Sequence, residues 1–287
     1  MGKTVDFESP VLRIEHDEAE AVATLWLDRA EARNAMGVDL WRDLPRAMAV
    51  LSADTTVRVV VVAAEGPHFS VGLDLKAMGS LLAGGGGGDS GGGAPASMAA
   101  RARSGRAEVL RLQDSITAVA RCPKPVIAAV HGYCIGGGVD LIAACDIRLA
   151  SSDAIFSVRE AKVAIVADLG SLQRLPAIIS SGHLAELAFT GKDINAERAK
   201  EIGLVNDVAA DVEGVHKAAQ TLAAEIAANS PLAVQGTKAV LAANDGRTVA
   251  EGLDYVATWN AGMLASDDLT EAMTAFMEKR PPKFTGR

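Results

Sequence analysis

The stretch "HGYCIGGGVDLIAACD" (His131–Asp146) decides the fold, because it places three glycines between an apolar run and a helical pattern. Glycine loses more backbone freedom on folding than any other residue, so three in succession are costly to order. Gly136, Gly137 and Gly138 are followed by "VDLIAACD", which has helical apolar spacing. Free backbone N–H groups and the positive end of a helix dipole meet at such a strand-to-helix turn. The turn is a candidate oxyanion hole or, alternatively, a tight turn packed under another element.

The segments around this turn alternate between strand and helix patterns. Two continuous β-branched runs, Val57–Gly66 and Lys124–Gly132, indicate strands that are buried on both faces. "VLRIEHDEAEAVATLWLD" predicts two short strands around an acidic turn, and "IRLASSDAIFSV" predicts two more. Val38–Leu51 has helical spacing, although Pro45 argues against an unbroken helix.

From about Leu172 the pattern becomes a succession of helices, with Asn195 as an N-cap and Ser230 before a proline as a helix start. We therefore predict an α/β core over residues 1–205 and a helical region over residues 206–287. The core contains a glycine-rich insertion at residues 84–93, "GGGGGDSGGG". No lysine and Ser/Thr pair follows these glycines, so we interpret them as a loop insertion and not as a phosphate-binding loop.

The composition restricts the class of protein. The chain has 287 residues, 49% of them hydrophobic, and a net charge of −8, which gives no general affinity for nucleic acid or anionic membranes. It contains no apolar run long enough to cross a bilayer, and its beginning is too acidic for a signal peptide. The three cysteines have neither pairing nor zinc spacing, which indicates reduced thiols. We expect a cytoplasmic protein that binds neither nucleic acid nor membrane.

Three acidic residues near the glycine turn are candidate catalytic groups. Asp140 lies in the first turn of the predicted helix, where its charge is favourable to the dipole whether or not it has another role. Glu160 follows a predicted strand, and Asp168 lies in an apolar segment. Composition alone favours Asp168 as the cap of the next helix over a carboxylate in an apolar pocket. Carboxylates gathered at one site would raise one another's pKa, which suits general acid–base chemistry.

From near residue 10 to near residue 280 the chain resembles the crotonase (enoyl-CoA hydratase/isomerase) superfamily. The resemblance rests on the glycine segment and on "LDRAEARNAM", "FSVGLDLKAM", "GSLQRLP", "AKEIGLVNDV", "SPLAVQGTKA" and "AFMEKR". It implies a crotonase fold, a spiral of ββα units, with C-terminal helices that form trimers. The chain is most similar to the Δ3,5-Δ2,4-dienoyl-CoA isomerase branch, which has Asp, Glu and Asp where Asp140, Glu160 and Asp168 stand.

The resemblance implies an isomerase that converts 3,5-dienoyl-CoA to 2,4-dienoyl-CoA. Backbone N–H groups of Leu73 and Gly137 would bind the thioester oxygen, while Glu160 and Asp168 move a proton from C2 to C6 and Asp140 assists. Neither metal nor separate cofactor is expected, because coenzyme A is part of the substrate. An enoyl-CoA hydratase, in which Asp140 and Glu160 activate water, is the alternative. A third hypothesis is a non-catalytic module that binds CoA or RNA, which the net charge and the complete set of acids oppose.

The resemblance also implies residues that hold the CoA and an assembly. Ala32 and Arg33 would lie near the nucleotide, and Lys76 follows the oxyanion segment. Phe276 and Lys279 would reach the nucleotide of a neighbouring subunit in a trimer or a dimer of trimers. Alternatively, the basic residues of this set are simply solvated surface. The family often has glycine where Ala164 stands, and the ending "KFTGR" differs from the C-terminal address of peroxisomal dienoyl-CoA isomerases, which fits the expected cytoplasmic location.

Overall fold

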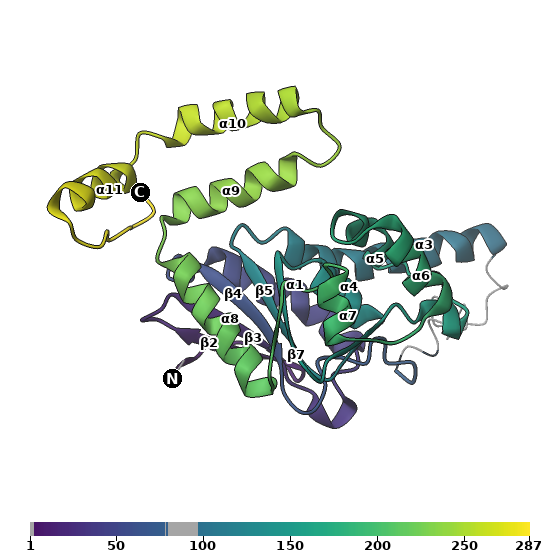
Figure 1. The fold of residues 1–287 in the computed structure, drawn as a ribbon. Coiled ribbons are helices and arrows are strands. Elements are labelled where there is room, and N and C mark those ends of the chain that lie inside the picture. The colour runs from purple at the N-terminus through teal and green to yellow at the C-terminus, as the bar shows by residue number, and fades with distance from the viewer. Residues whose placement is uncertain (1–2, 78, 80–96) are drawn as a thin grey trace.

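A seven-stranded sheet organises residues 3–77, 79 and 97–287, the part of the chain that this computed structural model describes (Figure 1). The predicted insertion at residues 84–93 lies outside these residues. β1, β2 and β3 pair antiparallel, and the pairs from β3 through to β10 are parallel. In spatial order the strands are β1 (Lys3–Thr4), β2 (Leu12–Asp17), β3 (Val22–Leu27), β4 (Val59–Ala64), β5 (Val126–Val130), β7 (Ile147–Ser151) and β10 (Asp207–Ala209).

A smaller sheet continues from the end of β5 and carries the glycine segment. It consists of β6 (Tyr133–Ile135), β8 (Ile155–Ser157) and β9 (Ile194–Asn195), with β6 parallel to β8 and β9 antiparallel to it. The strands predicted at the N-terminus, in both apolar runs and after Asp146 are therefore confirmed.

Helices fill both sides of the large sheet. The α-helices are α1 (Val38–Ala53), α3 (Met98–Ala120), α4 (Gly137–Ala143), α5 (Ser171–Arg174), α6 (Ser181–Thr190), α7 (Ala196–Glu201), α8 (Val212–Ala227), α9 (Pro231–Ala243), α10 (Val249–Met263) and α11 (Asp267–Glu278). Short 3₁₀ turns form η1 (Ala30–Ala32), η2 (Glu160–Val163) and η3 (Leu175–Ala177). Asn195 and Ser230 cap α7 and α9, as predicted. None of the described helices is both long enough and apolar enough to span a membrane.

The strand β4 shows why its sequence is β-branched throughout. Val60 and Val62 belong to the main hydrophobic core, which the sheet shares with α1, α3 and α4. Val59 and Val61 point the other way, into a smaller cluster with alanines and a valine of α8. Side chains alternate between the faces of a strand, so a strand that is covered on both sides must be apolar at every position. The cover on both faces confirms the prediction for this run.

The expectation that Pro45 would interrupt its helix is wrong. The helix α1 continues unbroken from Val38 to Ala53. Proline removes one backbone hydrogen bond and costs a helix interior about 3 kcal/mol. On the same helix a face of large apolar side chains, Leu40, Trp41, Leu44, Met48 and Leu51, is buried against the sheet. Burial contributes about 1.5–3 kcal/mol for each such side chain, so the helix continues in spite of the proline.

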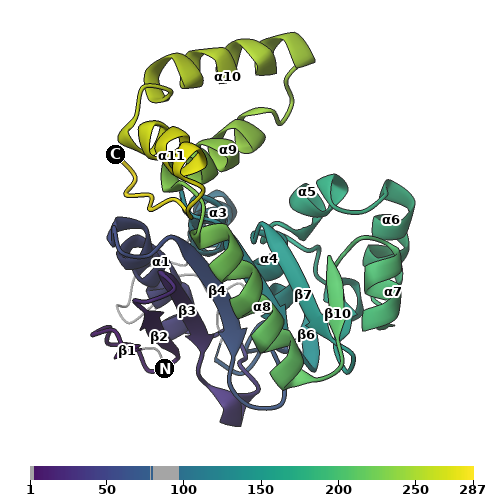
Figure 2. The same ribbon diagram turned by 60° about the vertical axis from the view of Figure 1, so that its left-hand side comes forward.

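The last three helices stand apart from both sheets, as Figures 1 and 2 show. The sequence predicts that the α/β core ends at residue 205 and the helical region begins at residue 206. Beyond that point β10 is still an edge strand of the large sheet, and α8 still packs on its face. The helices that stand apart are α9, α10 and α11. The three cysteines, all in the core, carry free thiols, as predicted.

Candidate functional site

The three glycines form the predicted strand-to-helix turn. The strand β6 ends at Ile135, and Gly136 is the N-cap of α4 with φ +53°, a left-handed conformation that favours glycine. The carbonyl of Gly136 accepts from the N–H groups of Val139 at 2.7 Å and Asp140 at 3.1 Å. The helix thus begins directly at the turn, and its first N–H groups point outward from its N-terminus.

A second segment brings another N–H group to this turn. Met36 donates its N–H to the carbonyl of Gly72 at 2.8 Å and accepts from the N–H of Asp74 at 3.0 Å. In such a parallel bridge the residue between the two, Leu73, turns its own N–H to the opposite side. A Cβ on Gly137 would lie 3.9 Å from the nitrogen of Leu73. Within the described residues, neither the Leu73 nor the Gly137 N–H donates a hydrogen bond.

Close approach of the two segments requires glycine at position 72. Gly72 has φ +82°, and a Cβ there would lie 2.6 Å from the carbonyl oxygen of Ile135. A Cβ on Gly137 would lie 2.9 Å from the sulfur of Met36. A side chain at Gly72 would separate the segments, and one at Gly137 would displace the side chain of Met36. The structure therefore brings together two free backbone donors, the arrangement of an oxyanion hole.

The carboxylate of Asp140 is fully buried, with 1% of the residue exposed. Its Oδ1 accepts from the backbone N–H of Ser171 at 2.6 Å and also from the hydroxyl of Ser171. Burial raises the pKa of Asp140 from its ordinary 3.8 to about 6, against the effect of these two hydrogen bonds. Asp140 therefore satisfies the start of α5, a role that its sequence position in α4 gives no sign of.

Glu160 lies beside the glycine turn. Its Oε1 is 3.2 Å from the position that a Cβ on Gly136 would occupy. Its Oε2 is buried and has no hydrogen-bond partner among the described residues. The pKa of Glu160 is raised from 4.5 to about 7, mainly by burial and to a smaller extent by the charges of Asp140 and Asp168. A carboxyl group with a pKa near neutrality can both accept and donate a proton at physiological pH.

Asp168 is not a helix cap, which corrects the interpretation favoured from composition. The N-cap of α5 is Gly170, and no side chain caps that helix from the N-cap position. Asp168 is half-buried between the buried residues Ala167 and Leu169. Burial raises the pKa of the Asp168 carboxyl. The residue is thus a carboxylate in an apolar setting, the reading that composition disfavoured.

The three carboxylates share one electrostatic environment. The charge of Asp168 raises the pKa of both Asp140 and Glu160. Such shifts occur between groups close enough to repel each other, and they are typical of proton-transfer sites. In the part of the chain that the structure describes, no cluster of three or more His, Cys, Asp or Glu side chains is placed to hold a metal ion.

The residues predicted to hold CoA fall into two groups. Ala32 is half-buried and Arg33 is exposed, and the carbonyl of Arg33 accepts from the N–H of Val71, so their segment adjoins the one that carries Leu73. Lys76 is exposed three residues after Leu73. Phe276 and Lys279 are exposed on or directly after α11, which both views place apart from α4 and α5. Within one chain the structure does not bring the second group to the glycine turn.

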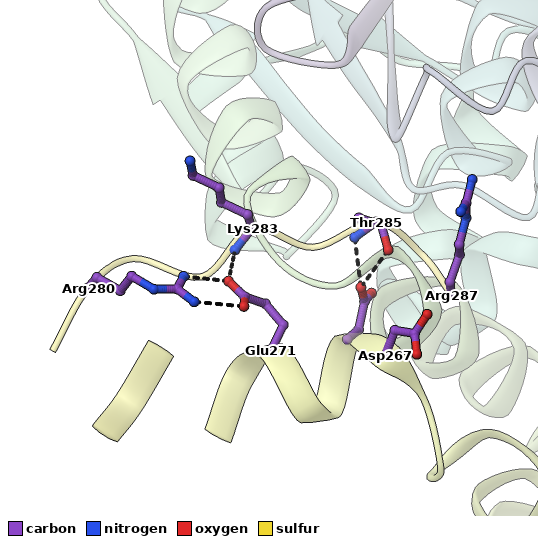
Figure 3. A pocket seen from close by; sticks show the side chains of 7 residues that line it. Asp267, Glu271, Arg280, Lys283, Thr285 and Arg287 are labelled. Atoms are coloured by element: carbon purple, nitrogen blue, oxygen red, sulfur yellow. Dashed lines mark hydrogen bonds and ion pairs between the residues drawn. The ribbon is translucent and has the colours of Figure 1, made fainter. Parts of the chain in front are cut away.

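A cavity of about 550 Å³ lies between α11 and the C-terminal tail, and it contains none of the three carboxylates (Figure 3). Glu271 accepts two hydrogen bonds from Arg280 and one from the N–H of Lys283. The N–H of Thr285 donates to Asp268. These contacts fasten the tail to α11, so Asp268, Glu271 and Arg280 already have partners. The lining residues are Asp267, Asp268, Glu271, Arg280, Lys283, Thr285 and Arg287.

Comparison with known sequences connects this geometry to one family. Residues 17–287 match the model of the enoyl-CoA hydratase/isomerase family. The chain is 44% identical to the peroxisomal Δ3,5-Δ2,4-dienoyl-CoA isomerase of Arabidopsis thaliana, over 92% of each chain. It is 42% identical to the mitochondrial enzyme of that name from Dictyostelium discoideum, over 95% of this chain and 90% of the relative. For the human mitochondrial enzyme the identity is 41%, over 99% of this chain and 84% of the relative.

Solved structures agree with the fold. An enoyl-CoA hydratase from Bacillus anthracis superposes with a TM-score of 0.84 at 30% identity, covering 96% of this chain and all of the other. A putative enoyl-CoA hydratase from Streptomyces coelicolor gives the same TM-score at 31% identity, covering 100% of this chain and 98% of the other. The resemblance to the crotonase superfamily and to its dienoyl-CoA isomerases, and the fold class expected from it, are confirmed. The chain belongs to the enoyl-CoA hydratase/isomerase family.

Proposed function

We propose that this protein is an isomerase that converts 3,5-dienoyl-CoA to 2,4-dienoyl-CoA. The observation that carries the proposal is the placement of Glu160 beside a turn with two free N–H donors, with a second carboxyl group, Asp168, near enough for its charge to raise the pKa of Glu160. The near full-length similarity to dienoyl-CoA isomerases supports it over the hydratase alternative. A hydratase holds one water between two acids and has no evident use for a third.

The Leu73 and Gly137 N–H groups bind the thioester oxygen. When a proton leaves C2, negative charge moves onto this oxygen and along the conjugated chain. Donors that are fixed before the reaction stabilise such charge by about 3–4 kcal/mol each. Because Gly72 and Gly137 carry no Cβ, the thioester can approach both donors closely.

One carboxyl group takes a proton from the substrate and another gives one to it. Glu160 lies beside Gly136, next to the oxyanion donor Gly137, so we assign it as the base at C2, the carbon beside the thioester. Asp168, in its protonated form, then delivers a proton to C6, at the far end of the conjugated system, and exchange with solvent returns the proton of Glu160 to Asp168 before the next turnover. One C–H bond breaks at C2 and one forms at C6, while the two double bonds move one carbon toward the thioester. The unpaired Oε2 of Glu160 is suited to the base.

Asp140 assists without direct proton transfer. Its Oδ1 is occupied by two hydrogen bonds from Ser171, which hold the loop between Asp168 and α5. Its negative charge raises the pKa of Glu160 toward neutrality. The overall reaction shifts one proton and two double bonds without oxidation or reduction, so the proposal includes neither a metal nor a separate cofactor, and coenzyme A enters as part of the substrate.

Substrate holding and assembly are part of the proposal. Ala32, Arg33 and Lys76 would lie along the CoA, while Phe276 and Lys279 would reach the nucleotide of a neighbouring subunit. Phe276 is 83% exposed, and α9, α10 and α11 together expose many large apolar side chains. Exposed apolar surface on such helices favours association of copies, and we propose a trimer or a dimer of trimers.

The proposed location is the cytoplasm, although the relatives named above include peroxisomal and mitochondrial enzymes. Fractionation of the source cells tests this proposal. Recovery of the protein within a membrane-bounded organelle would contradict it.

Incubation with two substrates tests the activity. With a 3,5-dienoyl-CoA we expect rapid growth of the absorbance of the conjugated dienoyl thioester. With crotonyl-CoA, a 2-enoyl thioester, we expect hydration that is slower by orders of magnitude. Fast hydration of crotonyl-CoA, without diene conjugation from the other substrate, would assign the protein as a hydratase.

A further inference from the structure

The main chain around Asp168 is held by side chains that neither the sequence nor the proposed chemistry singles out. The Nε2 of Gln113 donates to the carbonyl of Asp168 at 2.6 Å. The next carbonyl, that of Leu169, accepts from Nη1 of Arg174 at 3.3 Å. No side chain among the described residues donates a hydrogen bond to the Asp168 carboxylate itself, so the position of this carboxylate depends on its backbone.

Arg174 is held at both ends of its guanidinium group. Its Nη2 donates to the hydroxyl of Thr117 at 3.0 Å, while Nη1 contacts the loop at Leu169. The guanidinium lies directly against Gly170, where φ is +133° and a Cβ would be 1.7 Å from Nη1. Any side chain at Gly170 would displace the arginine. The glycine of "GSLQRLP" is therefore required by the arginine four residues later.

Both anchors on α3 come from one helix face. Gln113 and Thr117 are four residues apart and so lie next to each other on the helix surface. The buried positions Leu112 and Ile116 fix that face against the core. The loop from Asp168 to Ser171 is thus tied to α3 by Gln113 and Arg174, in addition to its contact with Asp140.

We propose that Gln113 and Arg174 are positioning residues, which hold the backbone of residues 168–170 so that the Asp168 carboxylate faces the acyl chain opposite Glu160. This inference rests on the proposed isomerase function. Arg174 has a second effect, because its positive charge favours the ionised form of Asp140 and so lowers the pKa of that carboxyl. Loss of position and loss of charge can therefore be separated by substitution.

The first test is Gln113→Met, which keeps the length of the side chain and removes its donor. A misplacement of about 1 Å costs on the order of 10²-fold in rate, so we expect kcat for 3,5-dienoyl-CoA to fall 10- to 100-fold. KM should change by less than about twofold, because the thioester contacts are untouched. Gln173→Met is the matched control, since Gln173 is exposed on α5 beside the same loop. An unchanged kcat in a folded Gln113→Met variant overturns the proposal.

The second test separates the two effects of Arg174. Arg174→Lys keeps the charge but cannot reach Thr117 and Leu169 together, so kcat should fall at every pH. Arg174→Met should lower kcat as well and, because the positive charge that favours ionised Asp140 is lost, change the pH dependence of kcat, which Arg174→Lys should not change. A merely structural role would lower stability in both variants and move neither profile.

The remaining outcomes are also decisive. If Gln113→Met does not fold, Thr117→Val tests the second anchor of the loop, because it keeps the shape of a half-buried side chain and removes only the acceptor for Arg174. Thr117→Val with wild-type kcat would then overturn the proposal. Failure of the wild-type enzyme to isomerise 3,5-dienoyl-CoA contradicts the proposed function instead. If the wild type isomerises 3,5-dienoyl-CoA and the variants have the same kcat, only the positioning role of Gln113 and Arg174 is contradicted.

Discussion

Soluble proteins usually bury apolar side chains and expose charged ones. The region around α4 and α5 buries charged side chains, whereas the region of α9 to α11 exposes apolar ones. Around α4, charged groups are buried: Asp140 is 1% exposed, and an oxygen of Glu160 is buried without a partner. In the C-terminal helices, large apolar groups are exposed, and α10 contributes no buried residue. Burying a charge costs free energy, and so does exposing an apolar surface.

The buried acids and the exposed apolar side chains have different explanations. The buried acids are unfavourable for folding and useful for proton transfer, because burial is what brings the pKa of Glu160 near neutrality. The apolar surface of α9 to α11 costs free energy while it is exposed to water, and its burial against another copy would be favourable. Changes in the first region should therefore alter catalysis, and changes in the second should alter association.

The largest effect is expected for the acids of the first region. Asp168→Asn and Glu160→Gln each remove one partner of the proton transfer while keeping the shape of the side chain. General acid–base groups contribute about 10²–10⁴-fold, so kcat should fall by that factor. Circular dichroism should show an intact fold. Wild-type activity in a well-folded Asp168→Asn variant would mean that this residue takes no part in catalysis.

The next effect concerns the second region. Leu253→Glu places a charge on the exposed apolar surface of α10, where the side chain is 63% exposed. If copies cover this surface, the charge should weaken each contact by at least about 2 kcal/mol. Sedimentation velocity should then show a shift from trimer or hexamer toward monomer. Met98→Glu, an exposed apolar position on α3, is the control and should leave the assembly intact.

The third prediction concerns the stability of the fold as a function of pH, whose direction follows from the raised pKa of Glu160. Folding raises the pKa of Glu160 from 4.5 to about 7, so the folded state binds the proton more tightly. The stability of the wild type therefore falls as pH rises from about 4.5 to 7. Glu160→Gln removes this loss, and it should be more stable than the wild type at pH 8 by on the order of 1–3 kcal/mol. Denaturant unfolding at pH 5 and pH 8 measures the difference, and an advantage equal at both pH values would contradict the assigned cause.

The smallest effect is at Ala164, where the family often has glycine. Ala164 has φ +60° at the end of η2, a left-handed conformation that costs a non-glycine residue roughly 1–2 kcal/mol. Ala164→Gly relieves this strain but increases the entropy of the unfolded chain, so we expect a net gain of about 0.5–1 kcal/mol. Ala161→Gly, within the same turn, should give no gain. Destabilisation of Ala164→Gly would contradict the account.

The sequence was sufficient for the longer strands and for the glycine turn, because their patterns are local, but it did not predict the short strands β1, β6, β9 and β10. The valines of β4 are apolar at every position since both faces are covered, and Gly136 to Gly138 mark a turn that only glycine fits. Local reasoning was wrong at Pro45, where burial of the large apolar side chains of α1 outweighs a lost hydrogen bond.

The arrangement of the site could not be predicted in the same way, because it depends on contacts between distant segments. Asp168 looked like a helix cap, yet α5 is satisfied at its start by Asp140, 31 residues away in sequence. Gln113 is 55 residues from the carbonyl that it holds. Its spacing of four from Thr117 is a signal only once the loop that both residues face is known. The family resemblance named the three acids but gave no account of what holds them.

The most direct test of the central claim is a crystal structure of the Glu160→Gln variant with 2,4-dienoyl-CoA bound. We predict that the thioester oxygen lies within hydrogen-bond distance, about 2.7–3.1 Å, of the nitrogens of Leu73 and Gly137. Residue 160 should lie beside C2 and the carboxylate of Asp168 beside C6. A thioester oxygen bound elsewhere, or Asp168 remote from the acyl chain, would contradict the account.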